Sequence, residues 1–163
     1  MSKVFNKKSV LAVREFLHKF ATEIEIIELK SSARTAKDAS ISLNTEVGAI
    51  VKSIVLKDRN NEFYLCLCSG DKYISIEKAS NLVDIPIEKA SASEVKAQTG
   101  FSIGGVSPVG HLNRPKTVLI DHNLAKFSKI YAAAGHPNLV FEATYNNLLE
   151  LTQGIPTDIV EKS

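Results

Sequence analysis

Two apolar runs separated by a short polar turn constrain the fold of this chain more than any other feature. Residues 50–57, with the sequence Ile-Val-Lys-Ser-Ile-Val-Leu-Lys, are rich in β-branched side chains, and residues 62–68 form a second apolar run. The Asp-Arg-Asn-Asn sequence at residues 58–61 between them has the composition of a turn. Two such runs on either side of a turn are typical of a β-hairpin. We therefore expect an antiparallel pair of strands here.

Short helices and further strands are expected on both sides of this hairpin. Apolar residues recur at helical spacing from Ser9, a candidate N-cap, to Phe20, and Ser91 with Glu94 forms a capping-box pair. The other expected helices begin near Thr35 or cover residues 76–82, 91–98 and 145–152, and the other expected extended segments cover residues 24–29, 73–76, 118–120, 129–132 and 139–142. Strands in runs with scattered helices favour an α+β fold around a mixed, mostly antiparallel sheet over a doubly wound fold. Because no repeat or flexible linker divides the chain, we expect one domain over residues 1–163.

Composition narrows the class of protein. The chain has 163 residues, 44% hydrophobic and 23% charged, which suits one compact domain with an adequate core. A net charge of +2 is too small to predict nucleic-acid binding from bulk electrostatics. A nucleic-acid partner would have to be bound by a local group of residues. No apolar run approaches the roughly 18 residues that span a bilayer, and no signal core follows the amino end. Two cysteines one residue apart predict no disulfide framework, so we expect a soluble cytoplasmic protein without membrane contact.

Basic side chains gather in the first 20 residues. This segment holds Lys3, Lys7, Lys8, Arg14 and Lys19 but only one acidic residue. Such a face can contact a phosphate backbone, although it is more often simply solvated.

Lys52 is unusual for the strand that carries it. Side chains alternate along a strand, so Lys52 shares a face with Ile50, Ile54 and Leu56, while Ser53 lies on the other face. A desolvated ammonium group costs several kcal/mol unless it is paired, loses its proton or meets an anionic ligand. A lysine near a strand end can instead extend its amine to water, and the strand alone favours that interpretation.

A loop rich in glycine and proline is the second unusual stretch. Residues 104–110 read Gly-Gly-Val-Ser-Pro-Val-Gly, and glycines let the backbone approach a ligand closely. The stretch is not a nucleophile elbow, because Gly110 falls one position late for Ser107 and Pro108 has no N–H to donate to an oxyanion. The glycine spacing also excludes a P-loop or a dinucleotide-binding loop. A tight connection without a ligand is an equally good interpretation.

A run of small residues precedes His136. Residues 132–138 read Ala-Ala-Ala-Gly-His-Pro-Asn, and as a loop they would leave room for a ligand. The four histidines and the two cysteines show no metal-ligand spacing, so we expect no metal and no cofactor. Ser69-Gly70-Asp71, after the hairpin, is first of all a turn.

Taken in order, these places resemble one family, the YbaK/ProX aminoacyl-tRNA deacylases, which are related to the editing domain inserted in bacterial prolyl-tRNA synthetases. The resemblance covers nearly the whole chain. Each fragment is weak alone and the ordered set is strong. The fragments are Thr35-Ala36, residues 50–56, Ser69-Gly70-Asp71, residues 104–110, and residues 133–138 with Val140-Phe141 behind them.

The resemblance implies the fold, the activity and the site. The fold would be the aminoacyl-tRNA synthetase-associated domain, with a six- or seven-stranded sheet and short helices around it. The activity would be trans-editing, the metal-independent hydrolysis of the ester that joins a wrong, small amino acid to the terminal ribose of a tRNA. Lys52 would be the catalytic residue, and the attacking water would be organised by the ribose hydroxyl and backbone amides. The implied substrate-binding residues are Thr35, Ser69, Gly104, Gly105, Ser107, Pro108, Gly135 and His136.

Two other functions stay open at this point. The chain could be a non-catalytic module that binds the acceptor end of tRNA or a partner aminoacyl-tRNA synthetase. Its pocket could also serve a free small metabolite. Retention of Lys52 and of the glycine loop favours the enzyme, since a non-catalytic relative would be expected to lose one of them.

Overall fold

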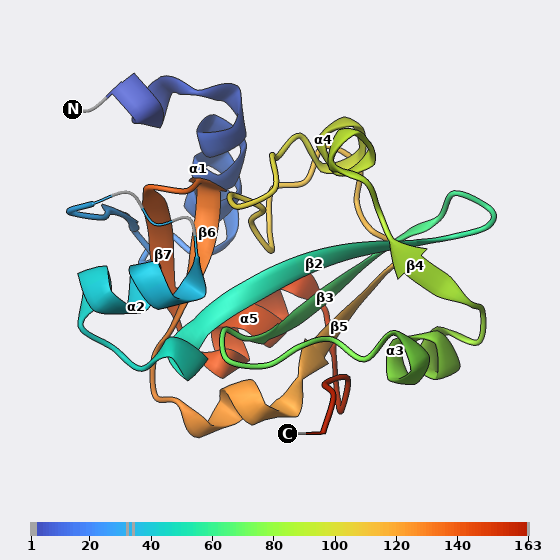
Figure 1. Ribbon diagram of the computed structural model, residues 1–163. Helices are drawn as coiled ribbons and strands as arrows, with labels where there is room; N and C mark the ends of the chain where they lie inside the picture. Colours follow the sequence, from blue (N-terminus) through green and yellow to red (C-terminus); the bar gives the residue numbers. More distant parts are fainter. Residues whose placement is uncertain (1–2, 32, 34, 163) are drawn as a thin grey trace.

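A mixed sheet of eight strands forms the framework of the computed structural model, which describes residues 3–31, 33 and 35–162 (Figure 1). The strands are β1 (Ile26–Glu28), β2 (Ile50–Asp58), β3 (Phe63–Ser69), β4 (Ile87–Lys89), β5 (Thr117–Asp121), β6 (Ile130–His136), β7 (Leu139–Ala143) and β8 (Ile155–Thr157). The helices are α1 (Lys8–Phe20), α2 (Ala36–Leu43), α3 (Ile76–Val83), α4 (Ala92–Thr99) and α5 (Tyr145–Thr152). Three short 3-10 helices cover Lys3–Asn6, Val47–Ala49 and His122–Lys126.

The strand order is β1-β7-β6-β2-β3-β5-β8, and β4 pairs with β2. Four pairs are antiparallel (β1 with β7, β6 with β7, β2 with β3, β2 with β4), whereas β2 with β6, β3 with β5 and β5 with β8 are parallel. In Figure 1 the ribbons of β6 and β7 run steeply against β2. The expected α+β class and the mixed, mostly antiparallel sheet are confirmed.

The sheet differs from the sequence prediction in its short strands. It has eight strands, close to the six or seven that the resemblance implies, and β4 and β8, of three residues each, were not predicted from the sequence pattern. Three residues are too few to show a two-residue hydrophobic alternation, and β8 contains Pro156. The strand expected at residues 73–76 is wrong, since Ile74 forms only an isolated bridge with Val160.

The small residues before His136 lie in a strand and not in the expected loop. Residues 130–136 form β6, which pairs with β7 through an irregular register near Ala133 and His136. Alanine and glycine are poor strand formers in isolation, so the pairing with β7 overrides their local preference.

All five predicted helices are observed within a residue or so of their expected starts, and only the N-cap expected for the first is wrong. The Thr35 hydroxyl accepts a hydrogen bond from Asp38 N, and Ser91 and Glu94 form the expected capping box. Ser9 is not the N-cap of α1, which begins at Lys8 after Lys7. The Ser9 hydroxyl instead donates to the Gly135 carbonyl oxygen at 2.8 Å. This tertiary hydrogen bond replaces the helix-capping hydrogen bond expected from the sequence.

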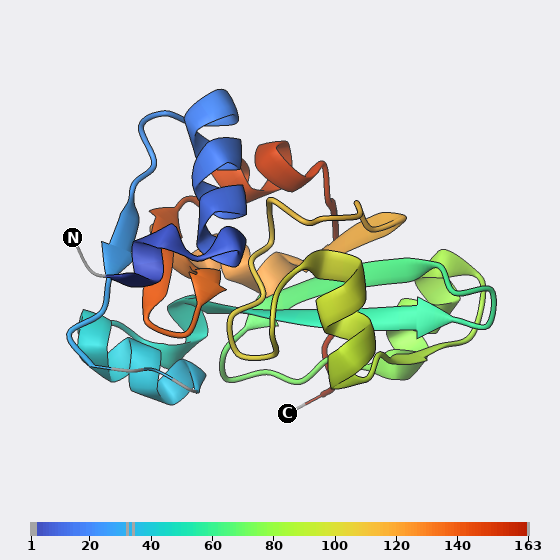
Figure 2. The same ribbon diagram turned by 90° about the horizontal axis from the view of Figure 1, so that it is seen from above.

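The two faces of the hairpin pack into different cores. Val51, Val55, Leu65 and Leu67 belong to the larger core, which α1 and α5 cover on one side of β2 and β3 (Figure 2). Leu56, Tyr64, Cys66 and Cys68 belong to a smaller core closed by α3 and the C-terminal segment. Lys52 is the register partner of Cys68 and therefore lies on the side of the smaller core. No described helix combines the length and the apolarity needed to cross a bilayer.

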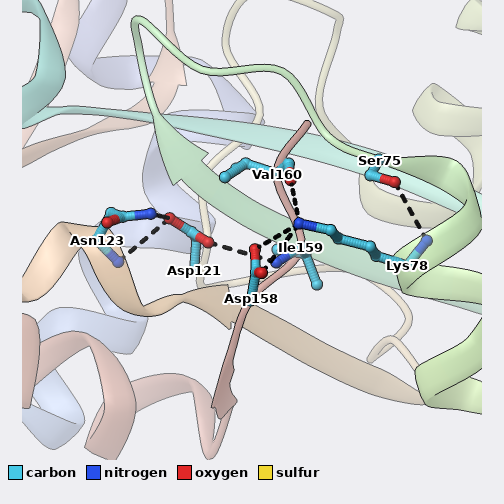
Figure 3. Close-up of polar contacts among 7 residues, drawn as sticks. All are labelled: Ser75, Lys78, Asp121, Asn123, Asp158, Ile159 and Val160. Atoms are coloured by element: carbon cyan, nitrogen blue, oxygen red, sulfur yellow. Dashed lines mark hydrogen bonds and ion pairs between the residues drawn. The ribbon is translucent and has the colours of Figure 1, made fainter. Parts of the chain in front are cut away.

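Two polar side chains, Lys78 and Asp121, hold the C-terminal segment against the smaller core (Figure 3). The Lys78 ammonium donates to both carboxylate oxygens of Asp158, at 2.9 and 3.0 Å, and to the Val160 carbonyl oxygen at 2.8 Å. Asp121, which is fully buried, accepts from Ile159 N with one oxygen and from the backbone and side-chain nitrogens of Asn123 with the other. The carboxylate of Asp121 thus satisfies three donors beneath the C-terminal segment.

Replacement of Asp121 should destabilise the protein more than replacement of Asp158. We expect Asp121→Ala to lower the free energy of unfolding by about 2 kcal/mol, because it leaves buried donors without an acceptor. Asp158→Ala removes only a solvent-exposed partner and should cost less. Urea denaturation of both variants measures the difference, and equal losses would contradict the role assigned to Asp121.

Candidate functional site

The sheet has a gap along one edge of β2. On that side β2 pairs with β6 only at Ile50 and Val51 and with β4 only at residues 56–58. The Val55 carbonyl oxygen accepts from Ala90 N, just before the β4 ladder. Peptide groups alternate in direction along a strand, so the N–H and C=O groups of Ser53 point to the same side as those of Val55. Ser53 therefore presents backbone hydrogen-bonding groups to the gap.

A cleft of about 470 Å³ lies at this gap, and we call it the β2 cleft. Its walls come from the segment that leads into α2, from β2, from the 103–106 loop and from the β6–β7 hairpin. The lining residues are Ala33, Thr35, Ala36, Lys37, Ala39, Val47, residues 50–54, Gly70, Ile103, Gly104, Val106, Tyr131, Ala133, Pro137, Leu139 and Val140. Most of them are apolar, and none is an Asp, Glu or His.

Lys52 places a positive charge in this apolar cleft. Its side chain is partly buried, and its ammonium nitrogen lies 4.3 Å from the centroid of the exposed Tyr73 ring. Among the described residues, Lys52 forms no ion pair and no side-chain hydrogen bond. Cation–π contact stabilises the ammonium only in part, because it neutralises no charge. Lys52 is thus a cation that lacks an anionic partner and lies beside the gap in the sheet.

Ser53 is a cleft residue that the sequence interpretation set aside. The side chains of Ser53 and Lys52 lie on opposite faces of β2, yet both residues line the β2 cleft. The cleft lies at the unpaired edge of the strand, where residues from both faces can reach it. The Ser53 hydroxyl is buried and has no hydrogen-bond partner among the described residues. Buried hydroxyls are normally paired, so an unpaired one next to a cleft is a candidate ligand contact. No sequence signal could have found it, because its environment depends on the missing neighbour strand.

The two glycines at 104 and 105 differ in whether their backbone N–H groups are already hydrogen-bonded. Gly104 lines the β2 cleft and has a φ of +96°, which L side chains rarely adopt. Its N–H donates to no described group, whereas the N–H of Gly105 donates to the Ser102 carbonyl oxygen at 2.9 Å. Of the two amides, only that of Gly104 therefore has no acceptor among the described residues.

The other four predicted residues from the loops and strand ends lie in different places, and two of them, Thr35 and Ser107, have hydrogen-bond partners of their own. Thr35 lines the β2 cleft and caps α2. Ser69 is buried at the end of β3, beside Gly70, and its hydroxyl has no partner among the described residues. Ser107 is fully buried: its hydroxyl accepts from Val109 N at 3.0 Å, and its carbonyl lies 2.6 Å from His111 Nε2. Pro108 lines a different cleft, of about 390 Å³, between α1 and α5.

His136 and Gly135 lie behind the β2 cleft. Together with Gly105 they line a third cleft, of about 450 Å³, which we call the lysine cleft. Its other lining residues are Lys7, Lys8, Ser9, Lys96, Ser102 and Pro137. Gly135 has a φ of +90°, and a Cβ on it would lie 2.6 Å from the Ser9 carbonyl oxygen. Gly135 therefore lets α1 pack against β6.

Neither the cysteines nor the histidines supply an obvious nucleophile or base to the β2 cleft. Burial raises the pKa of both thiols, Cys66 and Cys68, to about 12, and the Lys52 charge offsets this only in part at Cys68. Burial also lowers the pKa of His111 below its ordinary value. The described residues hold no group of three or more His, Cys, Asp or Glu side chains placed to bind a metal ion. The described residues that line the cleft offer lysines, hydroxyls and backbone groups to a ligand.

Comparison with known families and sequences gives consistent matches. The model of a family described as the aminoacyl-tRNA editing domain matches residues 30–151, which is more than half of the chain. A proline–tRNA ligase of Brachyspira hyodysenteriae is 30% identical over 73% of this chain and 20% of its own length. A protein of Enterococcus faecalis named EbsC, proposed to be a Cys-tRNA(Pro)/Cys-tRNA(Cys) deacylase, is 25% identical over 78% of each chain. The chain thus spans about a fifth of the ligase.

One solved structure matches closely over both chains. It is that of a protein proposed to be a trans-editing enzyme for prolyl tRNA synthetase, and it is 37% identical with a TM-score of 0.90. The alignment covers 96% of this chain and 99% of that chain. Together with the family match, it confirms the resemblance that the sequence fragments indicated.

Alanine at Gly135 should be more harmful to folding than alanine at Gly104. At Gly135 the new Cβ would overlap the Ser9 backbone, whereas at Gly104 the nearest atom is Pro137 Cγ at 4.0 Å. We expect Gly104→Ala to cost about 1–3 kcal/mol of stability through backbone strain, and Gly135→Ala to cost more because a clash is added. Thermal unfolding of the two variants measures this order, and the reverse order would contradict it.

Proposed function

This chain belongs to the aminoacyl-tRNA editing domain family, whose members deacylate aminoacyl-tRNA, and we propose that it acts in trans on a mischarged tRNA carrying a small amino acid. The reaction adds water across the ester between the amino acid and the terminal ribose. The carbonyl carbon gains the water oxygen, the ester C–O bond breaks, and the ribose hydroxyl takes up a proton. The products are the free amino acid and uncharged tRNA.

The observation that carries the proposal is the unpaired ammonium of Lys52 in the β2 cleft. An ammonium in an apolar cleft without a carboxylate partner favours an anionic or strongly polarised ligand. A charged tRNA end supplies both a terminal phosphate and an ester carbonyl. Lys52 therefore either neutralises that phosphate or orients the carbonyl, and in both roles it is the catalytic residue.

The β2 cleft is suited to a reaction that needs no strong base. An aminoacyl ester is already activated, so the protein has to position a water and stabilise the oxyanion that develops. Gly104, whose N–H donates to no described group, and Ser53, whose buried hydroxyl has no described partner, both line the cleft and are the candidate donors. Because none of the described residues that line the cleft is Asp, Glu or His, the water is oriented by the ribose hydroxyl next to the ester and by backbone carbonyls such as that of Ser53.

Small side chains limit the amino acid that can enter. Four alanines line the cleft, at positions 33, 36, 39 and 133, and the walls around them are made of branched apolar residues. A volume of about 470 Å³ must hold the terminal ribose together with the amino acid. Large side chains would then be rejected by collision, which is how an apolar pocket discriminates by size. The cysteinyl substrates in the name of the Enterococcus relative belong to the same small class.

The partner of the site is the acceptor end of aminoacyl-tRNA, since only that part of the molecule carries the ester. A prolyl-tRNA synthetase is a candidate second partner, because one matched ligase contains a related segment and the matched structure is described in relation to such a synthetase. The cytoplasm, where tRNAs are charged, is the place in which such an enzyme would act.

Loss of the Lys52 charge should abolish most of the activity. We expect Lys52→Met to lower kcat/KM for the best substrate by about 100-fold or more, as expected when a group that stabilises the transition state is removed. Lys89→Met, at an exposed position in β4, provides a control with the same change of side chain and should leave the rate unchanged. The assay follows release of amino acid from a panel of tRNAs charged with different amino acids.

Two outcomes of this assay would contradict the proposal. Equal rates for Lys52→Met and the wild-type protein would remove Lys52 from the mechanism. A wild-type protein that binds tRNA but hydrolyses no ester in the panel would instead indicate a non-catalytic binding module.

Loss of the Ser53 hydroxyl should slow the reaction without harming the fold. We expect Ser53→Ala to lower kcat/KM by about tenfold to 100-fold, the effect of one hydrogen bond to a charged group. Stability should stay the same or rise, since the hydroxyl has no partner among the residues that the structure describes. Ser42→Ala is the matched control, because Ser42 also has a buried, unpartnered hydroxyl but lies outside the β2 cleft. Equal rates for both variants would exclude Ser53 from the reaction.

A further inference from the structure

The lysine cleft gathers positive charge from two separate segments. Lys7 and Lys8 come from the start of α1, and Lys96 comes from α4. All three side chains are exposed, and no Asp or Glu is among the residues that line this cleft. Among the described residues none of the three forms an ion pair, and Lys96 donates only to the Gly100 carbonyl oxygen at 3.0 Å. Three like charges around one concavity favour a ligand with several negative charges.

His136 adds a neutral donor to this cleft. Its Nδ1 accepts a hydrogen bond from Asn138 N at 3.0 Å. Burial lowers the pKa of His136 below its ordinary value, and the Lys7 charge lowers it further. A neutral imidazole that accepts at Nδ1 carries its proton on Nε2, so His136 can donate from that nitrogen to an oxygen acceptor. Phosphate oxygens suit both this donor and the ammonium groups.

The lysine cleft and the β2 cleft are separated by a thin wall. Gly104 lines the β2 cleft and Gly105 lines the lysine cleft, while Pro137 lines both. A Cβ on Gly105 would lie 3.0 Å from His136 N, so the two loops meet backbone to backbone. An RNA chain whose 3′ end lies in the β2 cleft can therefore extend past these two loops and reach the lysines of the lysine cleft.

From this arrangement we propose that the lysine cleft binds the backbone phosphates of the single-stranded nucleotides that precede the acylated nucleotide of the tRNA. This assignment rests on the proposed function, because it places the terminal ribose in the β2 cleft. Lys7, Lys8 and Lys96 neutralise the phosphates, and His136 donates to a phosphate oxygen. Phosphate contacts do not distinguish one base from another, so the same lysines can bind any tRNA with a single-stranded 3′ end.

The test compares two triple variants with equal loss of charge. The first carries Lys7→Gln, Lys8→Gln and Lys96→Gln, and the control carries Lys89→Gln, Lys116→Gln and Lys162→Gln, at exposed positions outside the clefts described. The probe is a fluorescent RNA hairpin with a single-stranded 3′ end that terminates in CCA, and fluorescence anisotropy measures its affinity. Thermal unfolding of both variants shows that they fold like the wild-type protein.

We expect the cleft variant to bind the RNA at least tenfold more weakly, whereas the control binds within about threefold of the wild type. The slope of log affinity against log salt should fall by about 2 in the cleft variant, the value for three phosphate contacts on a single strand. Shortening the single-stranded end of the probe should remove the difference between wild type and variant. Equal weakening in both variants, or unchanged affinity in the cleft variant, would overturn the proposal.

A second readout separates this proposal from the proposed function. An aminoacyl ester of adenosine, which has no phosphate, should be hydrolysed equally by the wild-type protein and the cleft variant, while hydrolysis of aminoacyl-tRNA at low concentration falls with the affinity. Weaker hydrolysis of the adenosine ester in the cleft variant would place the lysines in the chemistry and overturn the phosphate role. If no ester is hydrolysed but RNA binding still depends on the lysines, the phosphate site stands and the deacylase fails.

Discussion

The incomplete pairing of β2 is the constraint on which the rest of the site depends. β2 is paired with β3 over most of its length, but its other edge is covered by β6 at one end and by β4 at the other. Between them, Lys52, Ser53 and Ile54 border a cleft in place of a neighbouring strand. A ligand in this cleft therefore meets backbone groups held rigidly by the sheet and side chains from both faces of β2.

Positive charge is distributed in two different ways around the two loops that meet at Gly105 and His136. Lys52 is a partly buried cation among mostly apolar lining residues, where a lower dielectric strengthens its interaction with a ligand, whereas Lys37 at the same cleft is exposed. The cluster of Lys7, Lys8 and Lys96 is exposed, so each contact is weak and screened by salt. A modest net charge of +2 is compatible with this division, because a weakly held substrate can be sampled and released.

Much of the fold could be predicted from the sequence, and the failures share a cause. The hairpin expected at residues 50–57 and 62–68 is observed as Ile50–Asp58 and Phe63–Ser69, because long β-branched runs carry a strong local signal. The strands β4 and β8 were missed and β6 was predicted only at its start, since these segments are short or built of small residues and depend on pairing with their neighbours. Ser9 was misassigned for the same reason: the carbonyl of Gly135, distant in sequence, takes its hydroxyl.

For the site, sequence by itself determined the chemical types: one lysine on an apolar strand face, a glycine loop, a run of small residues, and the family that this order identifies. Tertiary structure alone decided their grouping. It put Lys52, Ser53 and Gly104 in one cleft, moved Gly105, Gly135 and His136 to the other side of a thin wall, and buried Ser107 inside its own loop. The physical reason is that local patterns specify which face of a strand a side chain takes, whereas a cleft is defined by the strands and loops that fail to cover that face.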